Sequence, residues 1–205
     1  MRRKTGTLEH GTVRGHFSSP NHLVWEYFFT LRRLANEAEK SESEELSRQR
    51  TALTVIMAVT MVEVFLNLFF RVRVSEPHSM QHQTQFLADL NGRMSLDKKI
   101  RRWPSRILDK ELQLDSGPGK QFMELKELRN SLVHFTSTHE SVDLGDVQIH
   151  GLADSSAYDT LSARHATNAL LVAESVVEAI FRLAGLTEEQ VPHAMHAWTG
   201  KVAST

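Results

Sequence analysis

An arginine, an amide and a histidine lie within six residues in the second half of the chain, at a spacing that suits phosphoester chemistry. The stretch reads Arg129-Asn130-Ser131-Leu132-Val133-His134. The arginine guanidinium is a permanent planar cation that can bind two phosphate oxygens at once. A histidine imidazole has an ordinary pKa of about 6.5 and exchanges a proton near neutral pH. Together these groups can neutralise a phosphate and move a proton during its cleavage.

The segment from Lys120 to Phe135 is predicted to form the helix that carries this motif. Apolar residues recur along it at helical spacing, namely Leu125, Leu128, Leu132 and Phe135. At about 100° per residue, Arg129 lies roughly 80° from the centre of this stripe, and Asn130 and His134 lie one turn apart on the adjoining face. The motif therefore flanks an edge of the predicted core. Val133 makes that edge partly apolar, as expected of a surface that contacts a second subunit.

A second polar group lies on the most apolar helix that the sequence predicts, which ends at about Arg73. Thr60, Glu63 and Asn67 recur on it at spacings of three and four, so they share one stripe. Buried polar groups need partners. Glu63 and Asn67 are therefore expected either to satisfy polar groups within the core or to support the motif by holding Arg129.

A basic segment between Arg93 and Lys110 is a candidate for RNA binding. It contains seven basic residues against two aspartates. The candidate contacts are Lys98, Lys99, Arg101, Arg102, Trp103 and Arg106. Basic side chains follow a nucleic-acid backbone, and a tryptophan can stack on a base. The alternative is a solvated helix face whose tryptophan is anchored in the core.

Composition excludes several classes of protein. The chain has 205 residues, 40% of them hydrophobic and 24% charged, which is typical of a folded domain. It has no cysteine, so it contains neither disulfides nor thiolate metal sites. The net charge of −1 gives no bulk attraction to nucleic acid. Of the 11 histidines, His78 and His82, and His193 and His196, are paired by spacing, but no third ligand accompanies either pair, so we expect no metal and no cofactor.

One segment, Ala52 to Phe70, has the length of a membrane span. Glu63 and Asn67 interrupt it, and an ionisable group in mid-bilayer costs roughly 2.5–3.5 kcal/mol. We therefore expect a buried helix rather than a membrane protein. The basic start of the chain is not followed by the apolar centre of a secretory signal, which predicts a cytoplasmic location.

The remaining pattern predicts an all-α fold, an antiparallel bundle of about five helices with minor irregular or β excursions. Helices are expected to begin after Ser19, to end at about Arg73, and to run from Ser156 to Ala184, with a break at Pro104. Residues 136–153 are expected to be a short strand or irregular. Three parts follow: an N-terminal arm (1–18), the bundle (19–185) and a C-terminal tail (186–205).

The motif resembles the R-X4-H signature of the HEPN superfamily, in which a polar residue often follows the arginine. The stretch Met61 to Asn67 is similar to the core helix of several of its branches, which carries Glu and Asn. The resemblance covers residues 21–184, most specifically the motif helix. It implies a metal-independent endoribonuclease that is active as a homodimer through the motif helix.

In the family's reaction, the RNA 2′-hydroxyl attacks the adjacent phosphate and leaves a 2′,3′-cyclic phosphate. The resemblance makes His134 the general acid or base, Arg129 the group that neutralises the phosphate, and Asn130 the residue that orients the imidazole or contacts phosphate. It also implies a toxin-like role in bacterial defence, with a protein or nucleotidyltransferase antitoxin as partner. Two alternatives stay open, a non-catalytic HEPN-like module that binds RNA, nucleotide or protein, and a purely structural bundle.

Overall fold

The computed structural model describes residues 6–10, 13–17, 19–134, 142–143, 148–149 and 154–202. The long helices are α1 (Pro20–Glu39), α2 (Glu44–Arg73), α4 (Leu96–Leu108), α5 (Gly117–Val133) and α7 (Ala163–Leu183). Shorter ones are η1 (Pro77–His82), α3 (Gln83–Asn91), α6 (Ser156–Asp159) and α8 (Gln190–Thr199). Two antiparallel hairpins pair β1 (Gly6–His10) with β2 (Val13–Phe17), and β3 (Val142–Asp143) with β4 (Gln148–Ile149). The predicted all-α bundle, with small β excursions, is confirmed.

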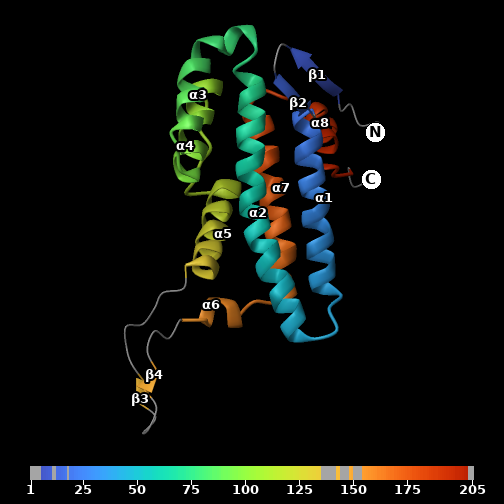
Figure 1. The fold of residues 1–205 in the computed structure, drawn as a ribbon, viewed down its shortest axis with the longest axis vertical. Coiled ribbons are helices and arrows are strands. Elements are labelled where there is room, and N and C mark those ends of the chain that lie inside the picture. The colour runs from blue at the N-terminus through green and yellow to red at the C-terminus, as the bar shows by residue number, and fades with distance from the viewer. Residues whose placement is uncertain are drawn as a thin grey trace.

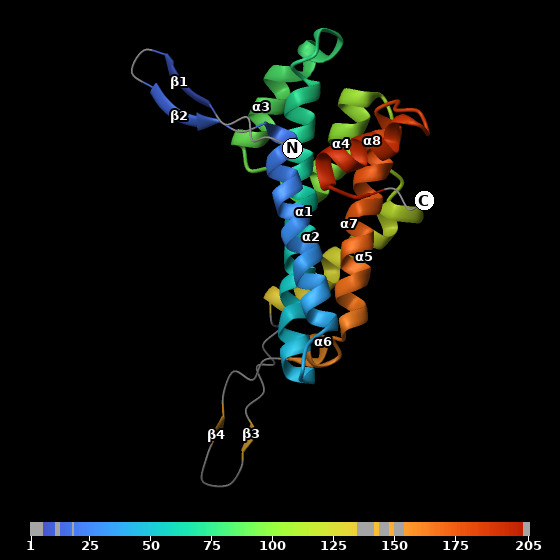
Figure 2. The same ribbon diagram turned by 90° about the vertical axis from the view of Figure 1, so that its right-hand side faces the viewer.

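Helix α2 is the centre of the bundle. It packs on α1, α7, α5 and α4, as Figures 1 and 2 show. Its start is fixed by Ser43, whose hydroxyl accepts a hydrogen bond from the Leu46 N–H at 3.2 Å, and Glu44 and Glu45 complement the helix dipole there. Its length qualifies it as a membrane span, yet 56% of its most apolar stretch is buried inside the bundle. The interpretation of this segment as a core helix is therefore supported.

Three features of the chain differ from the sequence-based expectation. The helix expected to break at Pro104 continues through it to Leu108, because Ile100, Trp103 and Ile107 bury one face of α4 and hold it together. The last long helix is split into α6 and α7 around residues 160–162. The segment predicted to be a tail instead contains α8, which packs against α1 with Val191 and Met195 buried.

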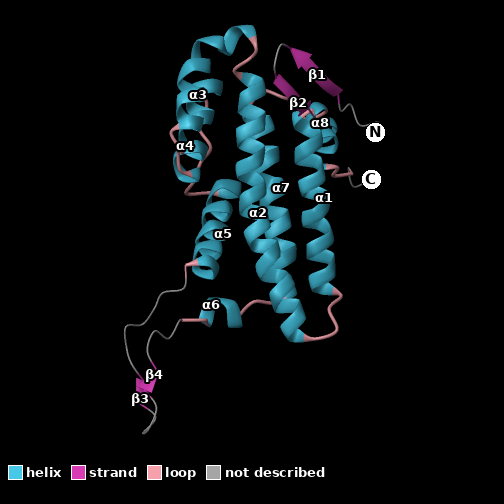
Figure 3. Cartoon of the chain, in the orientation of Figure 1, coloured by secondary structure: helices cyan, strands magenta, loops and turns pink. Residues whose placement is uncertain are grey.

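Charged side chains fasten the C-terminal segment to the bundle. Arg32 of α1 donates to the Glu174 carboxylate of α7 at 2.6 Å and to the Thr199 carbonyl at 2.5 Å, and Lys201 pairs with the same carboxylate at 3.3 Å. Glu174 is only 4% exposed, so it depends on these two cations. Gly200, at φ +73°, follows α8 directly, where a Cβ would lie 2.5 Å from the indole nitrogen of Trp25. Figure 3 shows this predominantly helical architecture.

Candidate functional site

The inner face of α5 differs from the predicted leucine stripe. Its buried residues are Gly119, Phe122, Leu125, Lys126 and Leu132, whereas Leu128 is only half-buried at its margin. Arg129 lies three or four residues from Leu125, Lys126 and Leu132, so it is on this same face. It is half-buried, and no ion pair holds it among the described residues. Arg129 is therefore a cation at the margin of the core without a carboxylate partner in the described part of the chain.

His134 lies outside the helix that was expected to carry it. Helix α5 ends at Val133, and His134 is its C-cap residue, with φ −111° and ψ 75°. Its backbone N–H still donates to the Asn130 carbonyl at 2.8 Å, while its side chain is exposed. Phe135, expected to close the stripe, is outside the described residues. The position of His134 relative to Asn130 is thus set by a helix end, and not by one further helical turn.

A chain of ion pairs, which the sequence reasoning missed, leads from α4 to the motif. Lys126 is 8% exposed, and its ammonium donates to both carboxylate oxygens of Asp97 at 2.8 Å. The same ammonium lies 2.9 Å from Glu127, and the Asn130 amide donates to Glu127 at 3.5 Å. One sequence feature could have indicated this network: Lys126 lies four residues after Phe122 and therefore shares its face of the helix. The network places Asn130 at the end of a charged chain that begins on another helix.

The ionisation of this network follows from its contacts. Burial opposes the charge on Lys126, but hydrogen bonds to Asp97 and Glu127 outweigh it and raise the pKa of this lysine above its ordinary 10.5. The hydrogen bond from Lys126 lowers the pKa of Glu127 below its ordinary 4.5. The Glu127 carboxylate therefore stays negative from neutral pH to below its usual titration range, so Asn130 faces a permanent acceptor under physiological conditions.

Glu63 and Asn67 do not hold Arg129. The Glu63 carboxylate accepts a hydrogen bond from Lys99 of α4 at 2.6 Å, and Lys99 itself is 6% exposed. The side-chain oxygen of Asn67 is buried and has no hydrogen-bond partner among the described residues. Glu63 thus joins α2 to α4, which fits the first of the two alternatives, polar satisfaction within the fold, and no described contact links it to Arg129.

The basic segment divides into core and surface residues. Trp103 is fully buried, packs against Phe70 and Phe86, and donates from its indole to Asp89 at 3.2 Å. Arg106 pairs with the same aspartate at 2.7 Å. Base stacking by Trp103 is therefore excluded, and Lys99 and Arg106 are engaged within the fold. Of the six candidate contacts, Lys98, Arg101 and Arg102 are exposed and without an ion pair among the described residues, so these three are free to contact RNA.

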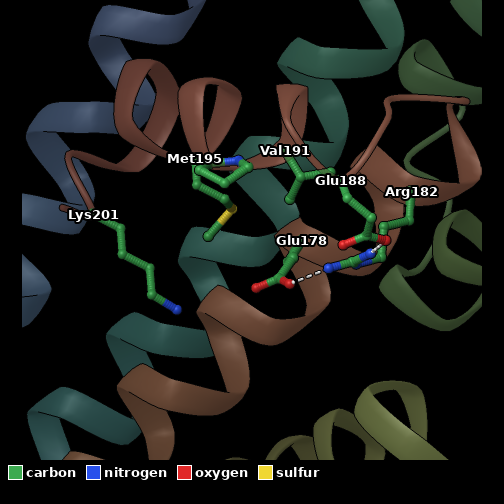
Figure 4. A pocket seen from close by; sticks show the side chains of 7 residues that line it. Glu178, Arg182, Glu188, Val191, Met195 and Lys201 are labelled. Atoms are coloured by element: carbon green, nitrogen blue, oxygen red, sulfur yellow. Dashed lines mark hydrogen bonds and ion pairs between the residues drawn. The ribbon is translucent and has the colours of Figure 1, made fainter. Parts of the chain in front are cut away.

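A separate cavity of about 160 Å³ lies between α7 and α8, and Figure 4 shows its lining. Met195 and Val191 form its apolar side, while Arg182 is held by Glu178 at 3.0 Å and by Glu188. This cavity includes no motif residue. In the described part of the chain, no cluster of three or more His, Asp or Glu side chains is arranged to hold a metal ion.

No family model, curated protein or solved structure matches this chain. The chemistry of the site is therefore inferred from its own residues and geometry. Near the C-terminal end of α5, the site contains a half-buried guanidinium with no ion pair in the described chain and an amide that donates to a carboxylate, and an exposed imidazole follows directly after the helix. These groups can bind a phosphate and exchange a proton at a surface.

Proposed function

We propose that this protein is a metal-independent endoribonuclease of the HEPN type. The observation that carries the proposal is the presence of Arg129, without an ion-pair partner in the described chain, five residues before the exposed His134 that caps the end of α5. A cation at the margin of a core is ordinarily paired, and an unpaired one is available for an anionic ligand. RNA phosphate is the anion that the arginine, amide and histidine together suit best.

The reaction is an internal phosphoryl transfer. The RNA 2′-oxygen bonds to the adjacent phosphorus while the bond from phosphorus to the 5′-oxygen breaks. His134 takes the proton of the 2′-hydroxyl or supplies one to the leaving 5′-oxygen, and solvent balances the other proton. Arg129 neutralises the charge on the pentavalent phosphate, and Asn130, oriented by Glu127, contacts a phosphate oxygen or the imidazole. The products are a 2′,3′-cyclic phosphate and a 5′-hydroxyl.

The direct test is incubation of the full chain with end-labelled RNA in excess chelator. We expect fragments that end in a cyclic phosphate, which resist phosphatase until acid opens the ring. Intact RNA across a range of sequences and of protein concentrations would reject the proposal. Fragments with 5′-phosphates would indicate a different, water-dependent reaction and would equally reject it.

Substitution of the three free cations of α4 tests the path of the RNA. The Lys98→Ala, Arg101→Ala, Arg102→Ala triple variant is expected to weaken RNA binding similarly for all sequences. It should also reduce the slope of log affinity against log salt by about two to three, since each phosphate contact contributes close to one unit or somewhat less. Filter binding at several salt concentrations measures both. A Lys120→Ala variant, which removes an exposed lysine of α5 that is 3.9 Å from Glu124, is the control and should leave the slope unchanged.

A non-catalytic binding module is the second candidate, and one observation favours it. Arg129 is on the inner face of α5, whereas His134 is exposed beyond the helix end, and the cavity between α7 and α8 is lined by neither residue. In that case RNA, nucleotide or a protein antitoxin would bind to the motif surface without cleavage. The proposed enzyme acts in the cytoplasm as a homodimer.

A further inference from the structure

One face of α2 is only partly covered by the rest of the bundle, although this is the most apolar helix of the chain. We call it the α2 face, and its residues are Leu46, Leu53, Met57, Thr60, Val64 and Leu68. Leu53 is 55% exposed and Leu46 36%. Figure 1 shows α2 between α1 and α5, with its middle uncovered toward the viewer. A helix that is apolar on all sides is ordinarily covered on all sides, so this face needs an occupant.

The neighbouring surface of α1 extends this face. Arg50 of α2 donates to the Glu37 carbonyl and to the Ser41 hydroxyl, which fixes the side of α1 that borders the α2 face. By helical spacing, Leu34, Tyr27 and Leu23 lie on that same side of α1, and the last two are 38% and 37% exposed. From Leu46 to Arg71 the face is about 38 Å long at 1.5 Å per residue.

The size of this face suits a protein partner. With a width of about two helices, or roughly 20 Å, its area is of the order of 750 Å². One partner in a stable interface of standard size contributes about 800 Å².

The charges at the two ends of α2 indicate which partner fits. Glu42, Glu44 and Glu45 are exposed at its start, and Arg71 is exposed at its end, without an ion pair among the described residues. If two α2 helices pack antiparallel, each acidic end meets the Arg71 end of the other. A parallel arrangement would instead bring like charges together, which is unfavourable.

We propose that the α2 face is the interface between two copies of this chain, with the α2 helices antiparallel about a two-fold axis near Met57 and Thr60. In this register Leu53 of one copy lies opposite Val64 of the other, and Gln49 lies opposite Leu68. The contact is isologous, so it closes as a dimer. It differs from a dimer centred on the motif helix, and it places α5 beside the interface. The proposal concerns self-association and does not depend on RNA cleavage.

The oligomeric state of the full chain tests the proposal. Sedimentation equilibrium should give a dimer for the wild type, and Leu53→Glu should raise its dissociation constant about 100-fold or more, since each dimer carries the change twice. Leu53 is mostly exposed, so the variant should keep its helical circular dichroism. Leu171→Glu is the matched control, because Leu171 is 52% exposed on α7 and should leave the dimer intact.

Engineered cysteines test the register, since the chain has none of its own. A mixture of Leu53→Cys and Val64→Cys chains should give a disulfide-linked heterodimer with copper phenanthroline, and each variant alone should cross-link poorly. In a dimer of Leu53→Cys chains alone, the two cysteines would be about 16 Å apart along the helix axis, too far for a disulfide. Efficient cross-linking of Leu53→Cys alone would reject the antiparallel arrangement. A monomer at all concentrations would overturn the proposal, and so would a monomer that floats with phosphatidylcholine–phosphatidylglycerol vesicles, which indicates a lipid occupant.

Discussion

Replacing His134 with alanine is expected to reduce the rate of RNA cleavage about 10²- to 10⁴-fold, which is the usual contribution of a positioned general acid or base. His134 is exposed at the end of α5, so its removal leaves the core intact. Unfolding free energy should therefore change by less than about 0.5 kcal/mol. Single-turnover cleavage of end-labelled RNA and urea denaturation measure the two quantities.

Companion variants separate the role of each motif group. Arg129→Ala should cost about 10²- to 10³-fold, since it removes a donor to the developing phosphate charge. Arg129→Lys should recover only part of this, because an ammonium lacks the planar fork of the guanidinium. Ser131→Ala is the matched control and should cleave normally. Ser131 is on the same helical turn, and its exposed hydroxyl donates only to the Glu127 backbone carbonyl among the described residues. Undiminished cleavage by His134→Ala would contradict the proposed mechanism.

Trp103→Ala is expected to destabilise the fold by about 3–5 kcal/mol, the range for large aromatic residues that are lost from a core. The indole is fully buried between Phe70 and Phe86, and it satisfies the Asp89 carboxylate together with Arg106. Its loss leaves a cavity and removes one of these hydrogen bonds. The free energy of unfolding in urea, measured by far-ultraviolet circular dichroism, gives the size of the effect.

The neighbouring residue supplies the control for this prediction. Arg102→Ala alters an exposed side chain of the same helix and should change stability by no more than about 0.5 kcal/mol. In a Trp25→Phe, Trp198→Phe variant, which keeps the buried Trp103 as its single tryptophan, RNA should not quench the tryptophan fluorescence. A Trp103→Ala protein of normal stability with lost RNA affinity would show that the tryptophan acts at the surface.

Local signals were sufficient to predict much of the fold. Pro20 in the first turn marks the start of α1, and the hydroxyl of Ser43 and the acidic residues after it mark the start of α2. These signals act within a few residues of the backbone groups that they satisfy, so they can be recognised without tertiary structure. The N-terminal arm was not assigned a structure from its sequence, and it contains the β1–β2 hairpin.

Long-range pairing limited the prediction of the site. Lys126 was not expected on an inner face, because its partner Asp97 is 29 residues away and no local pattern connects the two. For the same reason Glu63 could not be assigned to Lys99, which lies 36 residues further along. The predicted apolar stripe included Leu128, which is only half-buried. The helix was also predicted to continue to Phe135, whereas α5 ends at Val133. The catalytic roles of Arg129, Asn130 and His134 stay predictions that the cleavage assay will test.

The hydrogen bonds from Arg32 to Glu174 and Thr199 have a consequence for folding during synthesis. Helix α1, whose partners Glu174 and Thr199 are synthesised about 140 to 170 residues after Arg32, cannot dock fully until that later part of the chain has been made. The segment that includes α8 and Lys201 must leave the exit tunnel before Arg32 can bind both partners. Chaperones that shield exposed apolar helices would therefore meet this protein late in translation, and nascent chains stalled before residue 174 should stay protease-sensitive at α1.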